Sequence, residues 1–293
     1  MKISAPKLFS SKAEAVGILL FLLLAVAPLL LGIVYALGYS FGFLGLISEG
    51  VTLTYWERAL SDTELWISLL FTCYIALVTI SLTILGALVL TIFLRKPFRK
   101  GLSGFALYVP LAFPAIVVAF LVFQLASQSG LFARIACGAG IISETSGFPE
   151  LVNDPFGAGI IAAHTFMALP FFTLYFMNVY RQEQISSLVG VAETLGASPL
   201  QQVRRIIAPV LLRRAFPTIT LYTIFVMGSY EIPLILGRQS PQMISVLAIR
   251  KLRRFSLSTI PEAYITAIVF IMVITLLLLL VFRMKTFSYD IDE

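Results

Sequence analysis

Hydrophobic positions in this chain form long, uninterrupted runs. Six of the runs reach the length of about 20 apolar residues that a helix needs to cross the core of a bilayer. None of them alternates with a period of two, so they predict helices and not the strands of a membrane β-barrel. We predict membrane-spanning helices at about residues 15–37, 65–94, 105–128, 156–180, 216–236 and 262–282.

The composition agrees with a protein that lies in a membrane. Of its 293 residues, 59% are hydrophobic and 12% are charged, and the mean hydropathy is +0.97. A soluble domain averages about 25% charged residues, so a surface this poor in charge would not stay dissolved. The first apolar run exceeds the 7–15 residues of a signal peptide, and we interpret it as an uncleaved first helix. We therefore predict an all-α integral membrane protein with one transmembrane domain over residues 1–293.

Basic residues predict the orientation of the six spans. Most of the 21 Lys and Arg residues lie in the two tails, the loop after the second span and the loop after the fourth span. The positive-inside rule makes these segments cytoplasmic, so the net charge of +6 is a topology signal and not a sign of nucleic-acid binding. The loop after the fifth span breaks the rule, because it would face outside and still carries five basic residues. These are Arg238, Arg250, Lys251, Arg253 and Arg254. They either meet an acidic partner or substrate, or are simply solvated.

Residues suited to catalysis or metal binding are scarce. The chain has no phosphate-binding G-x-x-x-x-G-K-[ST] loop, no H-E-x-x-H zinc motif and no G-x-S-x-G nucleophile elbow. A single histidine excludes a histidine-based metal cluster. Cys73 lies inside an apolar run and Cys137 in a loop, so we expect neither to be part of a redox or metal pair. We expect a protein that is not an enzyme and binds no cofactor or metal itself.

The cytoplasmic loop at about residues 186–215 is predicted to form two short helices. Apolar residues recur there at helical spacing; they are Val189, Ala192, Leu195, Leu200, Val203 and Ile207. Gly196 lies where the first helix would end, in a left-handed conformation that glycine adopts at little cost. Ser198 is a good N-cap for the second helix, with Pro199 in its first position and Gln201 three residues after the cap. Pro209 is expected to end or kink that helix.

This loop resembles the signature loop of the membrane subunits of bacterial ATP-binding-cassette importers. The family pattern is Glu-Ala-Ala, three residues, Gly, nine residues, then Ile, any residue and Leu-Pro. Four positions match in register: Ala192, Gly196, Ile206 and Pro209. Three positions depart from it: Gly190 for the glutamate, Val191 for the first alanine and Ala208 for the leucine. The stretch from Gly196 through Ala197 and Ser198 to Ile206, GASPLQQVRRI, is typical of the loop.

The number of spans extends the resemblance over nearly the whole chain, which looks most similar to permeases of polyamine, ferric-iron, thiamine and sulfate importers. The resemblance implies a type I importer fold in the cytoplasmic membrane of a bacterium, with both termini inside. It also implies three kinds of partner: ATPase subunits that use ATP and Mg²⁺, a second permease subunit (a copy or a paralogue), and a solute-binding protein. The loop's first helix would seat in a cleft of the ATPase through Ala192, Leu195 and Gly196. Gly190 removes a charge from that contact.

Polar residues inside the spans are candidates for a solute pathway, because an ionisable group at the centre of a span costs about 2.5–3.5 kcal/mol. Glu231, beside Tyr230 near the outer end of the fifth span, either lines a pathway, binds a cationic solute, pairs with a loop arginine, or is hydrated. His164 is either a ligand or pH sensor, or a neutral imidazole bonded to a neighbouring helix, which is commoner. Gln124 and Gln128 are four residues apart on the third span and are expected to share a face.

These observations predict a permease subunit that forms half of a translocation pathway for a small hydrophilic solute. A polyamine-like cation would suit Glu231, and an anion or metal complex would suit the basic loop; the sequence leaves both open. The main alternative is an ion-coupled secondary transporter without an ATPase, which should show several deep carboxylates or an inverted repeat. An intramembrane protease using His164, or a structural subunit without a pathway, would leave the signature loop unexplained. Pro110 and Pro114 are the best candidates for a hinge.

Overall fold

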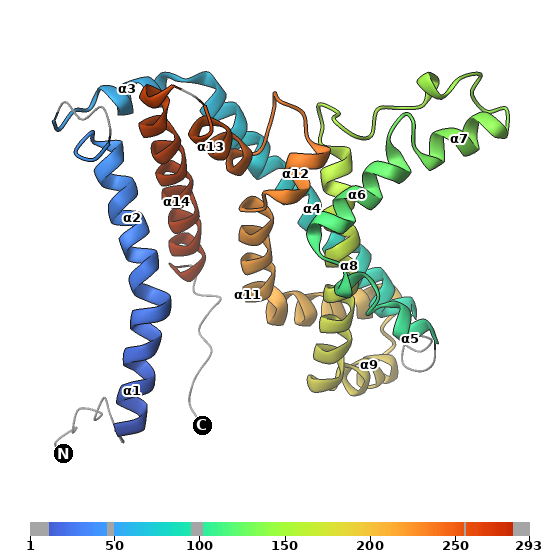
Figure 1. Cartoon of the computed structure of the whole chain (residues 1–293). Coiled ribbons are helices and arrows are strands. Elements are labelled where there is room, and N and C mark those ends of the chain that lie inside the picture. Colours follow the sequence, from blue (N-terminus) through green and yellow to red (C-terminus); the bar gives the residue numbers. More distant parts are fainter. Residues whose placement is uncertain (1–11, 46–49, 95–101, 255, 284–293) are drawn as a thin grey trace, which may run out of the picture. The chain divides into compact units, whose positions relative to one another are not determined.

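The computed structural model describes residues 12–45, 50–94, 102–254 and 256–283, and within them every regular element is a helix (Figure 1). The chain clusters into two compact units. Unit 1 comprises Met1–Asp62 and Ala248–Val273, and unit 2 comprises Thr63–Leu247 and Ile274–Glu293. Residues 1–11, 95–101 and 284–293, whose basic side chains contribute to the predicted orientation, lie outside the described part.

In the part of the chain that the structure describes, six helical segments are long and apolar enough to cross a membrane, which agrees with the number predicted from hydropathy. Their bounds are Val16–Ser40, Thr63–Phe93, Ala115–Gly138, Ala158–Gln182, Pro199–Met227 and Leu257–Val281. The second, fourth and sixth agree closely with the predicted runs. The third and fifth differ, because the helices there are interrupted at positions that hydropathy does not reveal.

Unit 1 begins with one long apolar helical segment. It consists of α1 (Lys12–Phe21), a π-helical turn η1 (Leu22–Val26) and α2 (Ala27–Ser40). The π turn comes directly before Pro28, whose missing N–H cannot continue the regular ladder. Three tyrosine rings join α2 to the first turns of α14 (Ile260–Arg283): Tyr264 lies 5.9 Å from Tyr35 and 4.9 Å from Tyr39 between ring centroids. Such aromatic pairs add to the area they bury.

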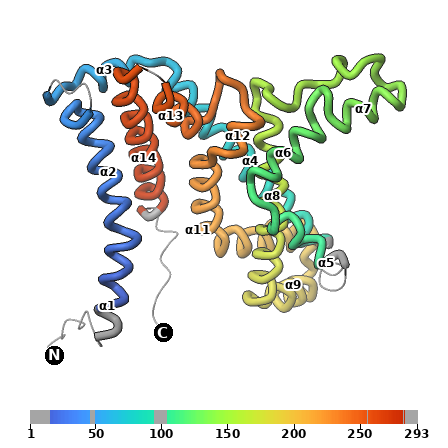
Figure 2. The backbone as a smooth tube through the Cα atoms, viewed as in Figure 1, coloured from blue at the N-terminus to red at the C-terminus, as the bar shows by residue number. Residues whose placement is uncertain are grey.

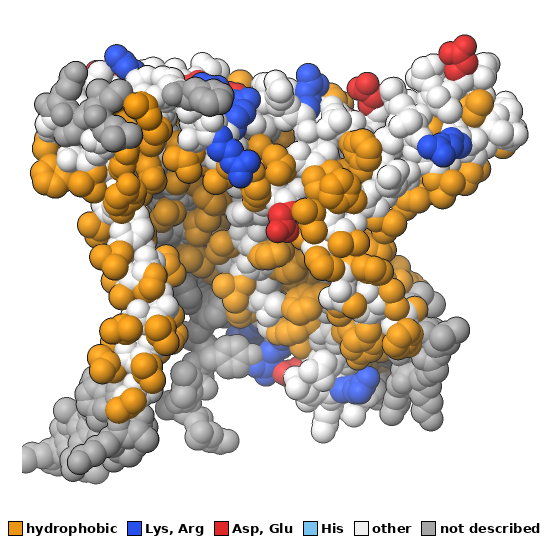
Figure 3. Space-filling view, viewed as in Figure 1, with side chains coloured by type: hydrophobic (Ala, Val, Ile, Leu, Met, Phe, Trp, Pro, Cys, Tyr) orange, Lys and Arg blue, Asp and Glu red, His pale blue; other side chains and the backbone are white. Residues whose placement is uncertain are grey.

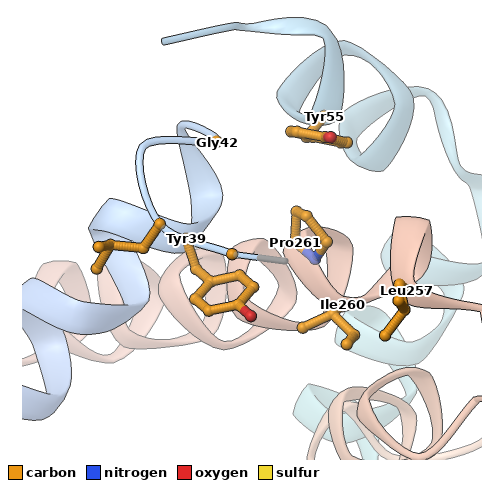
Figure 4. A pocket seen from close by; sticks show the side chains of 8 residues that line it. Tyr39, Gly42, Tyr55, Leu257, Ile260 and Pro261 are labelled. Atoms are coloured by element: carbon orange, nitrogen blue, oxygen red, sulfur yellow. The ribbon is translucent and has the colours of Figure 1, made fainter. Parts of the chain in front are cut away.

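A shallow hollow opens beside these rings, between the end of α2, α3 (Thr54–Ser61) and the start of α14 (Figure 4). It is lined by Tyr39, Gly42, Leu44, Gly45, Tyr55, Leu257, Ile260 and Pro261. The lining offers two phenol groups and no charged side chain, so it has little with which to hold a polar ligand.

The core of unit 2 is the packing of α4 (Thr63–Leu94) along α8 (Ala158–Gln182), the most extensive helix contact in the chain. Small and hydroxyl-bearing side chains of α4 face this contact, and a side chain added at Gly86 would collide with Leu169 of α8. Small residues allow two helix backbones to approach closely inside a membrane. The small residues of α4 therefore favour its close packing against α8.

The third span is broken where the proline pair predicts a hinge. A short helix α5 (Leu102–Ala106) is followed by a 3₁₀ turn η3 (Pro110–Ala112), two extended residues, and then α6 (Ala115–Ala126). Proline lacks the N–H that a continuous helix would need, and Phe113, which precedes Pro114, is extended as expected for a residue before proline, whereas Val109 before Pro110 stays helical. Beyond α6 the chain forms α7 (Leu131–Gly138) and the 3₁₀ turn η4 (Thr145–Gly147).

The fifth span starts earlier and ends earlier than hydropathy predicts. After α9 (Ile185–Thr194), the helix runs from α10 (Pro199–Gln202) through the π turn η5 (Val203–Ile207) into α11 (Ala208–Met227). Figures 1 and 2 show that this continuous helix bends, and α11 contains Pro217. The helix then stops at Gly228, and α12 (Glu231–Leu236) and α13 (Ile244–Leu252) follow.

Candidate functional site

The segment Ile185–Gln202, hereafter the docking segment, contains α9, a tight turn and α10. α9 ends in a Schellman motif: the N–H of Ala197 donates to the carbonyl of Ala192 at 2.9 Å, and that of Gly196 donates to Glu193 at 2.9 Å. Gly196 has a φ of +80°, in the left-handed region, and space around it is open. The backbone conformation, and not crowding, therefore calls for glycine here, as the sequence predicts.

α10 begins with the capping box predicted from the sequence. The N–H of Ser198 donates to Gln201 Oε1 at 2.9 Å, and the N–H of Gln201 donates to Ser198 Oγ at 3.4 Å. Pro199 occupies the first turn, where its missing N–H is harmless. Pro209 does not end this helix: η5 precedes it, and the helix continues as α11 with Pro209 in its first turn.

One side of α9 faces the interior of unit 2. Ile185 is fully buried, Ala192 nearly so, and Val189 lies between them. Ile185 belongs to a buried apolar cluster with Phe176 of α8 and Leu211 of α11, and Val189 and Ile206 pack against the same cluster. The side chain of Ala192 is thus buried by its own chain, whereas Leu195 and Gly196 are at the surface.

A second side of the docking segment presents large apolar side chains to the outside. Their exposed fractions are 47% for Leu188, 61% for Val191, 82% for Leu195 and 74% for Leu200. The first three recur at i, i+3 and i+7 and therefore form one stripe along α9, hereafter the apolar stripe. Gly190 lies on another edge of α9 with open space around it.

An ion pair fixes the start of the docking segment to α11. Arg214 Nε lies 2.6 Å from Glu183 Oε1, and a second nitrogen donates to Oε2 at 3.2 Å, so the pair is bidentate. Tyr175 donates its hydroxyl to the carbonyl of Arg214 at 3.3 Å. Both charged groups are partly exposed, which limits the pair to about 1 kcal/mol. Nearby, Arg204, Arg205 and Arg213 are exposed, so the surface around the docking segment is basic.

The single histidine is buried at the interruption of the fifth span. His164 is 1% exposed, and its Nε2 lies 3.0 Å from the hydroxyl of Ser229. The carbonyl of Ser229 in turn accepts a 2.5 Å bond from the hydroxyl of Ser245. His164 is thus bonded to a segment between two helices, and a role for it in a pathway stays a prediction. These contacts also secure the three residues between α11 and α12.

The other pathway candidates are only partly brought together. Glu231 is exposed as the first residue of α12, Tyr230 is half-buried, and Gln124 is exposed on α6, which packs against α12. The expectation that Gln124 and Gln128 share a helix face is wrong. α6 ends at Ala126, and Gln128 lies beyond it and donates to the carbonyl of Phe148 at 3.3 Å.

The basic loop contains an ion cluster within unit 1 that the sequence did not reveal. Lys251 is 1% exposed, and its Nζ lies 2.6 Å from Asp62 Oδ2 and 3.4 Å from Glu262 Oε2. Both interpretations of the basic residues, a partner contact and simple solvation, are wrong for Lys251, because it is enclosed by its own chain. Arg238, Arg253 and Arg254 are exposed. Among the described residues, His, Cys, Asp and Glu side chains form no group of three that could hold a metal.

A protein-family model now identifies the chain. The family described as "Binding-protein-dependent transport system inner membrane component" matches residues 83–286, more than half of the chain. The chain belongs to this family. The matched region includes the docking segment and four of the six candidate spans in full.

Individual relatives agree with this assignment. The inner-membrane component is 30% identical over 185 residues to the "Probable ABC transporter permease protein y4fN" of Sinorhizobium fredii (strain NBRC 101917 / NGR234). The match covers 61% of this chain, which spans only about a third (31%) of that protein's length.

Two solved structures share the fold at 16% identity. A bacterial alginate ABC transporter, in complex with an alginate pentasaccharide-bound periplasmic protein, has a TM-score of 0.64 and matches over 92% of this chain and 91% of its own. A bacterial ABC transporter involved in the import of the acidic polysaccharide alginate has a TM-score of 0.62, with 92% and 93% covered. The chain therefore shares its fold with these two transporter chains over most of its length.

Proposed function

We propose that this inner-membrane component is the permease subunit of an ATP-driven importer, and that its docking segment binds a separate nucleotide-binding subunit. The observation that carries the proposal is the apolar stripe. It lies on a segment in which a Schellman motif ends α9 and a capping box begins α10, so the turn between the two helices is ordered. Large apolar side chains that are more than half exposed favour burial, at about 25 cal/mol for each Å² removed from water.

The local structure of the docking segment suits a rigid contact. The Schellman motif at Gly196 and the capping box at Ser198 order the turn before any partner arrives. Binding by an ordered segment avoids much of the entropy cost of fixing a loop. The helix that starts at Pro199 continues to Met227, so a displacement of the docking segment would be carried along the fifth span to the break at Ser229.

The charges around the docking segment favour a cytoplasmic location for it. Arg204, Arg205 and Arg213 are exposed at this end of unit 2, and basic residues concentrate on the cytoplasmic side of membrane proteins. Hydrolysis of ATP with Mg²⁺ would then take place in the partner, and this chain would contribute half of the pathway. A second permease subunit, a copy or a paralogue, would contribute the other half.

The solute is expected to be small and hydrophilic, delivered by an extracytoplasmic binding protein. Exposed Glu231 at the start of α12 would attract a cation such as a polyamine. Exposed Arg238, Arg253 and Arg254 would attract an anion or the acidic surface of a binding protein, and the two similar structures are described as handling an acidic polysaccharide. The carboxylate and the arginines would therefore attract ligands of opposite charge.

The test is affinity purification of the tagged chain in mild detergent, followed by mass spectrometry of the proteins that accompany it. Leu195→Glu places a charge in the apolar stripe and should abolish co-purification of the nucleotide-binding subunit. Ser186→Glu, on an exposed polar edge of the same helix, is the matched control and should leave it intact. A chain that purifies alone and moves solute in liposomes without ATP would instead be an ion-coupled secondary transporter.

A further inference from the structure

The segment between α6 and α8 contains a short helix with an uncovered apolar side. On α7 the exposed fractions are 49% for Leu131, 47% for Phe132 and 57% for Ile135. Residues at i, i+1 and i+4 lie on one side of a helix, because each residue advances the helix by about 100°. The three side chains therefore form one patch, hereafter the α7 patch.

The opposite side of α7 is held by the chain itself. Ala133 is fully buried, the thiol of Cys137 donates to the carbonyl of Ser143 at 3.7 Å, and Arg134 Nε donates to the carbonyl of Ser129 at 3.0 Å. These contacts orient the helix about its own axis. The α7 patch points away from them, so its exposure follows from how the helix is anchored.

The direction of α7 is set by a turn that needs glycine. Only Ser127–Gly130 separates α6 from α7, and the N–H of Gly130 donates to the carbonyl of Ser127 at 2.8 Å. A side chain at Gly130 would come within 2.8–2.9 Å of the carbonyl oxygens of Gln124, Leu125 and Ser127. The backbone packs too tightly here for any residue other than glycine, so the turn has a defined conformation.

We propose that α7 lies on the outer surface of the lipid bilayer, with the α7 patch inserted among the lipids. The patch continues an exposed apolar surface of a candidate membrane-spanning segment: α6 exposes Ile116, Val117, Phe120 and Leu121 before the turn, and such a surface favours lipid over water. Figure 3 shows hydrophobic side chains running from α6 along one edge of the α7 arm, with a basic side chain beside that edge and an acidic one on the opposite side of the arm.

The dimensions and chemistry of α7 fit an interfacial helix. The third candidate span, Ala115–Gly138, is α6 and α7 taken together, but the turn at Gly130 separates them. α7 alone has eight residues and measures about 12 Å, too short to cross a bilayer core of about 30 Å. An apolar face with a cation at its border is the pattern of helices that lie in the interface plane. α7 would hold the outer end of the third span at the membrane boundary, where the segment leading to α8 begins.

The test measures collisions of a spin label with oxygen, which concentrates in lipid, and with a Ni²⁺ chelate, which stays in water. The full chain, with Cys73→Ala and Cys137→Ser, which keeps a donor for the carbonyl of Ser143, is reconstituted in nanodiscs with and without its partner subunits. The label is placed at Ile135→Cys. Leu121→Cys on α6 serves as the lipid reference, and Glu144→Cys, exposed beyond α7, serves as the water reference.

We expect the label at Ile135 to favour oxygen in the same direction as the label at Leu121, and the label at Glu144 to favour the Ni²⁺ chelate. Adding Gly130→Ala should shift Ile135 toward the Ni²⁺ chelate and leave Leu121 unchanged. A label at Ile135 that is open to the Ni²⁺ chelate in the parent chain would overturn the proposal in favour of a hydrated helix. One that is shielded from both reagents in the assembled complex would overturn it in favour of a protein contact.

Discussion

Lys251 shows what a single residue contributes in this protein. A buried ammonium is costly unless it is paired and hydrogen-bonded, and Lys251 has two carboxylates within reach, Asp62 and Glu262. The three groups come from the end of α3, α13 and the first turn of α14, all within unit 1. The cluster therefore ties together segments of unit 1 that are far apart in the sequence.

Replacing Lys251 by Met should destabilise unit 1 by about 3 kcal/mol, because it removes the buried ammonium that bridges two neighbouring carboxylates. Thermal unfolding of the purified chain in detergent would report the loss as a lower Tm. Arg253→Met, at an exposed position of the same loop, should leave Tm nearly unchanged. Equal, small effects of the two substitutions would show that the ion cluster does not stabilise the fold.

Residue-level prediction worked where the determining contacts are local. The positions of Gly196, Ser198 and Gln201 within a few residues of one another were enough to predict the turn, the cap and the left-handed glycine. Lys251 and Asp62 are separated by 189 positions, and no spacing rule connects them. The role of Lys251 could only emerge from the folded chain.

At the level of helices, hydropathy predicted the number of spans but not their interruptions. A proline pair was a visible signal for the break in the third span. The three residues of the break at Gly228–Tyr230 include no proline, and they lie inside the predicted fifth span. The error on Gln128 has the same origin: helical periodicity was extended past Ala126, where the helix ends. Bonds from His164 and Ser245 to Ser229 stabilise the break, and these partners are distant in sequence.

The end of α9 offers a matched pair of glycines for a test at this level. Both Gly190 and Gly196 have open space for a side chain, but only Gly196 has a positive φ. Gly196→Ala should cost about 1 kcal/mol, because L-residues disfavour the left-handed region. Gly190→Ala lies within the helix and should be neutral or slightly stabilising.

Hydrogen exchange of the amides at residues 195–198 measures this difference directly. Gly196→Ala should speed their exchange about fivefold, the equivalent of 1 kcal/mol, and Gly190→Ala should not. If both variants exchanged at the rate of the parent chain, the left-handed turn would not be what fixes the docking segment.

At the scale of the whole molecule, the chain is a membrane protein with two exposed apolar surfaces. The apolar stripe of the docking segment and the α7 patch are both uncovered within the chain. Family membership and the shared fold explain why, since an inner-membrane component of a transport system is built to contact other molecules. The sequence could predict the loop from its motif, but not that Ala192 turns inward while Leu188, Val191 and Leu195 face out.

The most direct test of the central claim is photo-crosslinking from the apolar stripe in native membranes. A photoreactive residue at Leu195 should form a cross-link to a nucleotide-binding subunit, and ATP should change its yield. The same residue at Ser186 should form little or none. Cross-links from Leu195 only to lipid, with no protein partner in the presence or absence of ATP, would contradict the account.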